Sequence, residues 1–215
     1  AGVWPVDCGQ ILIDGKDISA LPEHKRAPYL GRVFQDPMTG TVADMEIIEN
    51  LAIAARRGKK RGLSWGVKAD ERIRYRQMLA EFDLGLEDRM SSKVGLLSGG
   101  QRQAITLLMA TIKKPKLLLL DEHTAALDPK TAAKVLELSD KIIAENNLTA
   151  LMVTHNMHDA ITHGNRLIMM SDGKIILDIS GEEKKNLTVE HLLEMFEKAS
   201  GSKLENDRML LSKDK

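Results

Sequence analysis

Two short and mostly apolar runs constrain the fold of this sequence more than any other feature. "KLLLLD" (116–121) and "LTALMVT" (148–154) have the length of buried strands, and polar or charged residues follow each of them. Amphipathic stretches at 100–113, 130–145 and 156–163 alternate with these runs. Apolar strands that alternate with helices predict a parallel sheet with helices packed on both faces. The sequence therefore predicts an α/β fold.

The first hundred residues depart from this alternation. Strand patterns at 9–18 and 30–36 are followed by two helical patterns, at 44–57 and 69–84, before the apolar strands begin. Because this helical block interrupts the strands, we predict an α-helical lobe inserted into the sheet domain. We place the sheet core at residues 1–37 and 108–185, the helical lobe at 38–107, and a C-terminal helix and tail at 186–215.

Composition excludes several classes of protein. Lys+Arg and Asp+Glu both number 31, so the formal net charge is zero and no overall basic field attracts nucleic acid. No apolar run approaches the roughly 20 residues that a membrane-spanning helix needs. The basic run at 56–62 is predicted to be a solvated surface, with contact to anionic lipid or to a partner protein as the alternative.

The stretch "LSGGQ" (97–101) stands at the start of a helical pattern. Ser98 and Gln101 have the spacing of a capping box, which by itself accounts for an ordinary helix start. Gly99 and Gly100 need a further reason, since glycine weakens a helix but lets a ligand approach the backbone closely. A helix N-terminus with unpaired N–H groups also attracts anions. The stretch is therefore either a plain helix cap or part of a phosphate site.

Polar side chains follow three of the predicted strands. Asp121 and Glu122 come directly after four leucines, Gln35 stands at the end of the strand pattern at 30–36, just after "VF", and His155 follows "LMVT". Each residue taken singly has a plainer interpretation, as a surface acid, a loop residue or a structural histidine. Ligands of open α/β sheets bind at the carboxyl ends of the strands, where oxygen donors can hold Mg²⁺ and a glutamate can polarise water. The set together predicts magnesium-assisted phosphoryl transfer to water.

These motifs together resemble the ATP-binding subunits of ABC transporters. "LSGGQ" resembles the family signature, "LLLLDE" the Walker B motif and "AALD" (125–128) the D-loop, while Gln35 resembles the Q-loop glutamine and His155 the switch histidine. The resemblance runs from Ala1 to about residue 196. "DEHTAALDP" departs from the common "DEPT" by placing His123 where proline usually stands. This variant is similar to ATPases of uptake systems for tryptophan, tyrosine or related small solutes.

The resemblance implies a P-loop NTPase (RecA-like) core and a role for each motif. Glu122 is expected to be the general base for the hydrolytic water, and His155 to contact the γ-phosphate of ATP. Asp121 and Gln35 are expected to attend Mg²⁺. The signature residues are expected to bind a nucleotide seated on a second subunit, with the D-loop aspartate at the same interface: Ser98, Gly99, Gly100, Gln101 and Asp128.

The sequence contains no GxxxxGK(S/T) loop, the phosphate cradle of this family. In the family this loop precedes the segment that resembles "AGVWPV", so we expect an incomplete P-loop NTPase core that is inactive alone. The implied partners are transmembrane permease subunits docked on the helical lobe, a second and identical ATPase subunit, and indirectly an extracytoplasmic solute-binding protein. The implied location is the cytoplasmic face of the cell membrane, as a peripheral subunit.

Three functions remain open from the sequence. The leading one is the ATP-hydrolysing subunit of an ABC-type importer for a small solute, with ATP and Mg²⁺ as cofactors and no nucleic acid bound. The alternative is a soluble ABC ATPase that acts on nucleic acid or ribosomes. Neither the long coiled-coil insertion nor the second cassette of such proteins is apparent, and the zero net charge also disfavours them. The third is a folded remnant without catalytic activity.

Overall fold

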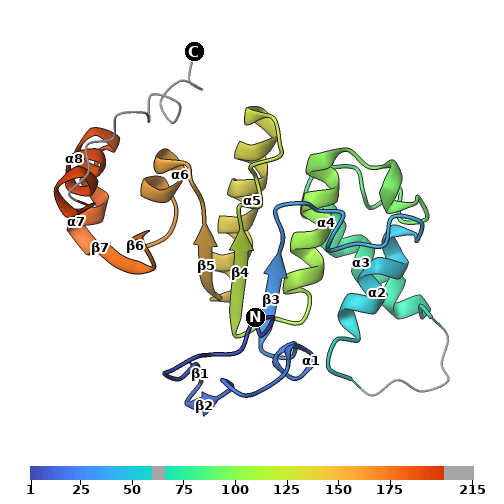
Figure 1. The fold of residues 1–215 in the computed structure, drawn as a ribbon. Helices are drawn as coiled ribbons and strands as arrows, with labels where there is room; N and C mark the ends of the chain where they lie inside the picture. The colour runs from blue at the N-terminus through green and yellow to red at the C-terminus, as the bar shows by residue number, and fades with distance from the viewer. Residues whose placement is uncertain (60–65, 201–215) are drawn as a thin grey trace. The chain divides into compact units, whose positions relative to one another are not determined.

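A computed structural model describes residues 1–59 and 66–200 of the chain, as two compact units. The first unit is Ala1–Val153 and the second begins at Thr154. The described elements are shown in Figure 1. The predicted tail at 201–215 and the end of the basic run, 60–62, lie outside the described residues.

The first unit is built on a three-stranded parallel sheet in the order β3-β4-β5. Its strands are β3 (Leu30–Val33), β4 (Leu117–Asp121) and β5 (Thr149–Val153). Leu120 of β4 pairs with Val33 on one side and Met152 on the other, and Asp121 pairs with Val153. The carboxyl ends of the three strands therefore lie level at one edge, and the parallel sheet predicted from the apolar runs is confirmed.

One face of this sheet is packed by the helices α4 (Gly99–Thr111) and α5 (Pro129–Asn146). Val33, Leu118 and Leu120 are at most 1% exposed on this face. A Cβ atom on Gly31 would lie 2.6 Å from the carbonyl oxygen of Ala110, so the missing side chain is what lets α4 approach β3 this closely.

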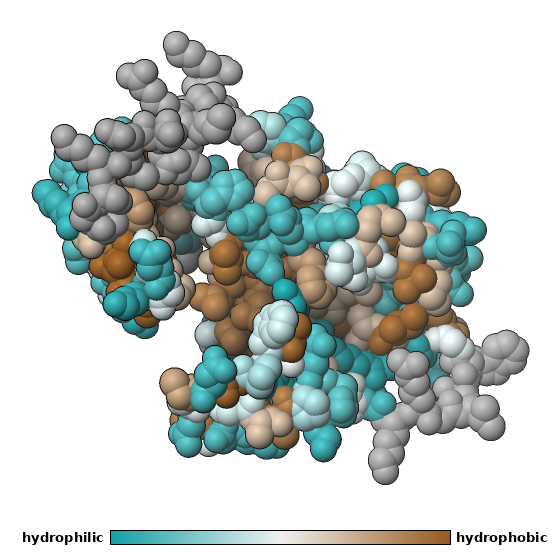
Figure 2. Space-filling view, viewed as in Figure 1, coloured by the Kyte–Doolittle hydropathy of each residue, from teal (hydrophilic) through white to brown (hydrophobic). Residues whose placement is uncertain are grey.

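The opposite face of the sheet is more open than the sequence predicts. Leu151 is 51% exposed and Val153 is 50% exposed, and with Leu119 they form part of the lining of a cavity of about 380 Å³ beside the N-terminal segment. Figure 2 shows apolar surface over the sheet in the middle of the view. Within the first unit, the described helices pack on one face of the sheet, so the prediction of helices on both faces is not borne out by this unit taken by itself.

A second cluster of apolar side chains lies among helices. The elements α2 (Ile47–Ala55), α3 (Ala69–Ala80) and a 3₁₀ helix (Val94–Leu96) pack against the flank of α4 that faces away from the sheet. The members of this cluster that are fully buried are Ile47, Leu51, Tyr75, Leu79, Leu86, Val94 and Ile105. The helix α4 thus contributes to both apolar clusters. Leu107 and Ala110 pack on the sheet, while Ile105 and Leu108 pack on α2 and α3.

The basic run after α2 is folded back onto the protein where it is described. Arg57 donates a hydrogen bond of 3.0 Å to the carbonyl oxygen of Ala110, near the C-terminal end of α4. Burial lowers the pKa of its guanidinium. Arg56 donates to the carboxylate of Glu71 at 3.1 Å. The prediction of a solvated surface is therefore wrong for these two arginines, since each has a partner that is remote in sequence.

Short elements complete the first unit at its N-terminus. A turn joins β1 (Leu12–Ile13) to β2 (Lys16–Asp17), and α1 (Glu23–Arg26) follows. The guanidinium of Arg26 is almost fully buried and donates hydrogen bonds of 2.7 Å to the carbonyl oxygens of Leu21 and Ser19. This arginine holds the N-terminal segment together where few apolar side chains are available.

The second unit pairs β6 (Arg166–Ser171) with β7 (Lys174–Ser180) as an antiparallel hairpin. Its helices are α6 (Met157–Thr162), α7 (Gly181–Lys185) and α8 (Val189–Ser200). The Thr188 hydroxyl accepts a hydrogen bond from the backbone N–H of His191 at 3.2 Å and so caps the start of α8. Leu167, Ile179, Leu187 and Leu192 form its buried core. In the described parts of both units, no helix is long and apolar enough to cross a membrane.

The contact between α4 and α5 leads to a prediction. A Cβ atom on Gly100 would lie 2.1 Å from the Cγ2 methyl of Thr131. Gly100→Ala should therefore lower the free energy of unfolding, measured by urea denaturation, by about 1–3 kcal/mol. In a Thr131→Ser background that methyl is absent, and the same change should become neutral or stabilising, because alanine favours a helix over glycine by about 1 kcal/mol. An equal loss in both backgrounds would show that the methyl is not the obstacle.

Candidate functional site

The edge of the sheet where the strands end collects three of the residues singled out from the sequence. Asp121 is the last residue of β4 and Glu122 follows it. Gln35 stands two residues after Val33, which pairs with Leu120. The structure therefore places Gln35, Asp121 and Glu122 at the same edge, as parallel strands in register require.

Asp121 is paired with a residue that the sequence analysis did not single out. Its Oδ2 atom lies 3.0 Å from Nη2 of Arg32 on β3, and both side chains are partly exposed. The same guanidinium lies 4.4 Å from the centre of the Phe34 ring. An arginine inside the otherwise apolar "LGRVF" was the available signal, since a charge on a buried strand needs a partner. The carboxylate predicted to attend Mg²⁺ thus already faces a cation.

Glu122 has an unusual backbone conformation. Its φ angle is +44°, in the left-handed region that residues other than glycine seldom adopt. Its N–H donates to the carbonyl oxygen of Val153 on β5, and its carbonyl accepts from the N–H of Ala125, each at 3.0 Å. Such strain persists only where the surroundings hold it, and it is frequent at functional sites.

His123, whose role the sequence left open, is buried. Its side chain is 2% exposed, and its Nε2 lies 3.0 Å from the hydroxyl oxygen of Ser139 on α5. The Ser139 hydroxyl also donates to the carbonyl oxygen of Val135 at 2.8 Å. The residue after Glu122 is therefore tied to the helix that packs beneath the sheet.

The capping box predicted at "LSGGQ" is confirmed. The Ser98 hydroxyl accepts from the N–H of Gln101 at 3.3 Å, and the Gln101 side chain accepts from the N–H of Ser98 at 3.2 Å. Gln101 also donates to the carbonyl oxygen of Leu84 at 3.3 Å. Ser98 and Gly99 remain exposed at the N-terminus of α4, where backbone N–H groups are available to an anion.

The D-loop residue Asp128 lies beside this helix start. It is exposed and caps α5, accepting from the N–H of Thr131 at 3.1 Å. Hydrogen bonds from Thr131, through its side chain and its backbone, lower the pKa of the Asp128 carboxyl. A Cβ on Gly99 would lie 3.2 Å from Leu127, and Gly100 abuts Thr131. The signature and D-loop segments are thus brought side by side.

Gln103 connects α4 to the segment that leads into Gln35. It is fully buried, and its Nε2 donates to the carbonyl oxygen of Phe34 at 3.2 Å. Its Oε1 atom has no hydrogen-bond partner among the described residues. The sequence analysis did not identify this contact, because the two residues are 69 positions apart.

His155 belongs to the second unit and is described with it. It is exposed and follows the last residue of β5 by two positions. The next residue, Asn156, caps α6 by accepting from the N–H of Asp159 at 3.2 Å. The group at the edge of the sheet therefore consists of Gln35, Asp121 and Glu122, and the predicted role of His155 stays a prediction.

The donors at the edge suit a magnesium ion that arrives with a nucleotide. Asp121, Glu122 and Gln35 offer the oxygen ligands that Mg²⁺ prefers, and this ion usually binds one or two carboxylates while water and phosphate complete its shell. In the residues that the structure describes, no cluster of three or more histidine, cysteine or acidic side chains forms a complete metal site. The residues present thus fit Mg²⁺ held jointly with phosphate groups.

Comparison with known proteins agrees with these motifs. A family profile described as "ABC transporter" matches residues 1–125. The chain is 46% identical over 199 residues to a tyrosine transport ATP-binding protein of Clostridioides difficile (strain R20291), covering 93% of this chain and 79% of that relative. It is 34% identical over 183 residues to a spermidine/putrescine import ATP-binding protein of Haemophilus influenzae (strain ATCC 51907 / DSM 11121 / KW20 / Rd). That match covers 85% of this chain and 46% of the relative, so the chain spans about half of its length.

Solved structures show the same fold. An ATP-binding cassette of an ABC transporter in its ADP conformation superposes with a TM-score of 0.72 at 27% identity, covering 91% of this chain and 79% of that one. A nucleotide-free cassette superposes with a TM-score of 0.68 at 26% identity, covering 85% and 74%. The predicted α/β core of the P-loop NTPase type is thereby confirmed, and the chain belongs to the ATP-binding subunits of ABC transporters.

Proposed function

We propose that this chain is the energy-coupling ATPase of an importer for a small solute, with tyrosine or a related amino acid as the candidate cargo. The observation that carries the proposal is the level edge of β3 and β4, which groups Gln35, Asp121 and Glu122. The names of the tyrosine and the spermidine/putrescine relatives support uptake as the direction and a small solute as the class of cargo.

In the proposed mechanism each residue at the edge has one task. Glu122 accepts a proton from the attacking water, and the fixed left-handed backbone holds its position. Asp121 and Gln35 hold Mg²⁺, which supplies positive charge to the phosphate oxygens when it is bound. Since Arg32 is paired with Asp121 in this structure, binding of the metal requires this carboxylate to be shared or released. His155 is assigned to the γ-phosphate.

The signature segment is proposed to act on a nucleotide carried by a second ATPase subunit, one that includes the phosphate loop. Its backbone N–H groups stand at the start of α4, where the helix dipole favours a phosphate. Ser98, Gly99, Gly100 and Gln101 would bind there, and Asp128 lies beside them because α5 packs on Gly100. The arrangement supports a homodimer in which each subunit completes the site of the other.

Glu122→Gln tests the proposed base in an ATPase subunit that includes the phosphate loop and is assembled with its permease. Because the amide cannot accept the proton, ATP turnover should fall by about 10²–10⁴-fold. ATP-driven pairing of the subunits, followed by light scattering, should persist. Glu137→Gln on the exposed side of α5 is the matched control and should leave turnover unchanged. Turnover of the Glu122 variant at the parental rate would show that another group is the base.

A further prediction concerns the 215 residues by themselves. They contain no GxxxxGK(S/T) loop, so the cradle for the β- and γ-phosphates is absent from this polypeptide. We therefore expect weak binding of MgATP and no hydrolysis by the chain alone, measured by titration calorimetry and by phosphate release. Micromolar affinity for MgATP would contradict this expectation.

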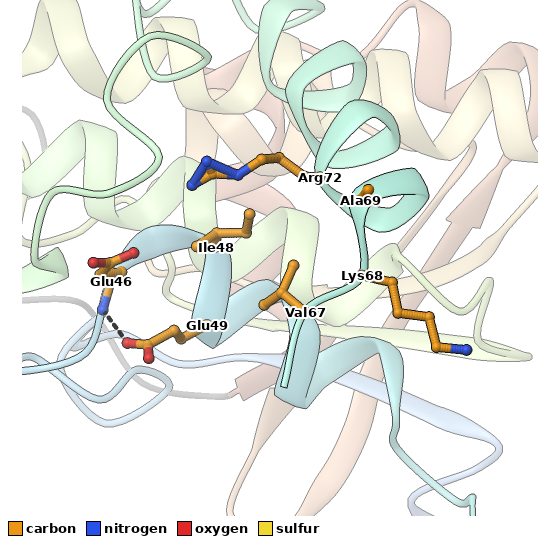
Figure 3. A pocket seen from close by; sticks show the side chains of 7 residues that line it. All are labelled: Glu46, Ile48, Glu49, Val67, Lys68, Ala69 and Arg72. Atoms are coloured by element: carbon orange, nitrogen blue, oxygen red, sulfur yellow. Dashed lines mark hydrogen bonds between the residues drawn. The ribbon is translucent and has the colours of Figure 1, made fainter. Parts of the chain in front are cut away.

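The helical lobe at 38–107 is proposed to contact the permease, at the cytoplasmic face of the membrane. A cavity of about 330 Å³ lies between the start of α2 and the start of α3. In Figure 3, Ile48 and Val67 lie close together in it, Arg72 extends across it, and the Lys68 side chain points away. An apolar floor within a charged rim suits a short amphipathic segment of a partner.

Val67→Asp tests this docking site. A carboxylate on the apolar floor should weaken assembly with the permease, measured by co-purification of the two subunits, because binding must remove this charge from water. Gln77→Asp adds the same charge at an exposed position of α3 that does not line the cavity, and it should assemble normally. Equal assembly of both variants would exclude this cavity as the contact.

A further inference from the structure

We propose that His123 is a positioning residue, which holds Glu122 in its left-handed conformation through a hydrogen bond to Ser139. The proposal rests on the proposed role of Glu122 as the base. The turn that begins at Glu122 links β4 to α5, and His123 is its only residue that is almost fully buried.

The direction of this hydrogen bond follows from Ser139. A hydroxyl has one proton, and the Ser139 oxygen lies 2.8 Å from the carbonyl of Val135, which can only accept. Both contacts are hydrogen bonds at once only if Ser139 donates to Val135 and accepts from an N–H on Nε2 of His123. The imidazole is thereby tied to a hydroxyl whose own orientation is fixed by the helix.

Together with the contacts at the two ends of the turn, the His123–Ser139 contact restrains its backbone. At its first residue, the N–H of Glu122 is bound to Val153 on β5, and its carbonyl is bound to Ala125. At its far end, Asp128 caps α5. The His123–Ser139 contact joins the start of the turn to the middle of α5, so Glu122 cannot relax to an ordinary φ without breaking a buried hydrogen bond. An unpaired buried polar group is costly, which makes this a restraint on the backbone of the base.

The restraint has a consequence for catalysis. A base must stand within hydrogen-bond reach of its water, and a displacement of about 1 Å can reduce the rate about a hundredfold. Loss of the His123 contact should therefore reduce kcat. The KM for ATP should change little, since His123 is buried and contacts α5 instead of the exposed edge of the sheet.

The experiment uses three single variants, one double variant and one control, in an ATPase subunit that includes the phosphate loop and is assembled with its permease. His123→Leu removes the donor, Ser139→Ala removes the acceptor, and His123→Gln offers a replacement N–H of similar reach. Thr111→Val is the control, because Thr111 is also a buried helix residue whose hydroxyl donates back to a carbonyl of its own helix, that of Leu107 at 2.8 Å. The double variant His123→Leu/Ser139→Ala tests whether the two residues act through one contact.

We expect kcat to fall about tenfold to a hundredfold in His123→Leu and in Ser139→Ala, with KM unchanged. The double variant should be no slower than the slower single variant, and His123→Gln should recover most of the rate. In the 215-residue chain, amide exchange at Ala125 should speed up in the two single variants and stay unchanged in Thr111→Val. This readout reports the turn itself and does not depend on hydrolysis.

Parental kcat in both single variants, with turnover abolished by Glu122→Gln, would overturn the positioning role and leave the proposed function intact. The positioning role would also be overturned if His123→Gln did not recover kcat and Thr111→Val lost as much kcat as the single variants. Such a loss would reflect a general fall in stability. If Glu122→Gln retained full turnover, the assignment of the base would fail instead, and the Ala125 exchange would decide whether His123 anchors the turn.

Discussion

The structure depends first on the parallel pairing of β4 between β3 and β5. Backbone hydrogen bonds hold Leu120 level with Val33 and Met152, so the three strands end together. Because side chains alternate between the faces of a strand, a shift of one residue in β4 would exchange its buried and exposed sets. Leu118 and Leu120 would then leave the core, and Asp121 would turn toward α5. The position of the acidic pair is therefore set by the burial of the leucines before it.

The second constraint is the close packing of α4. Because Gly31 has no side chain, the C-terminal half of α4 packs closely against β3. Because Gly100 has none, the start of α5 at Thr131 packs closely against α4. One helix thereby touches the sheet, the helical cluster and the D-loop segment. The glycines of "LSGGQ" thus have a packing role in this chain, and this role is compatible with exposed N–H groups at the same helix start. Gln103 adds a polar contact from this helix to the segment before Gln35.

Much of the fold was predictable from local pattern. Apolar runs predicted β4 and β5, and the capping box at Ser98 was correct because it depends on residues three positions apart. The short helices α1 and α7 were missed, since four or five residues carry too little periodicity. The open face of the sheet was also missed, because a continuous apolar run does not reveal which of its faces is covered.

The sequence by itself determined the class of fold, the family and the identity of the polar residues at the strand ends, because these follow from periodicity and from short motifs. Only the tertiary structure decided what those residues contact. Arg32 meets Asp121 across 89 positions, Arg57 meets Ala110 across 53, and His123 meets Ser139 on a helix that begins only after the turn. Such partners are selected by burial: a charged or polar group removed from water must find a counterpart wherever the fold provides one.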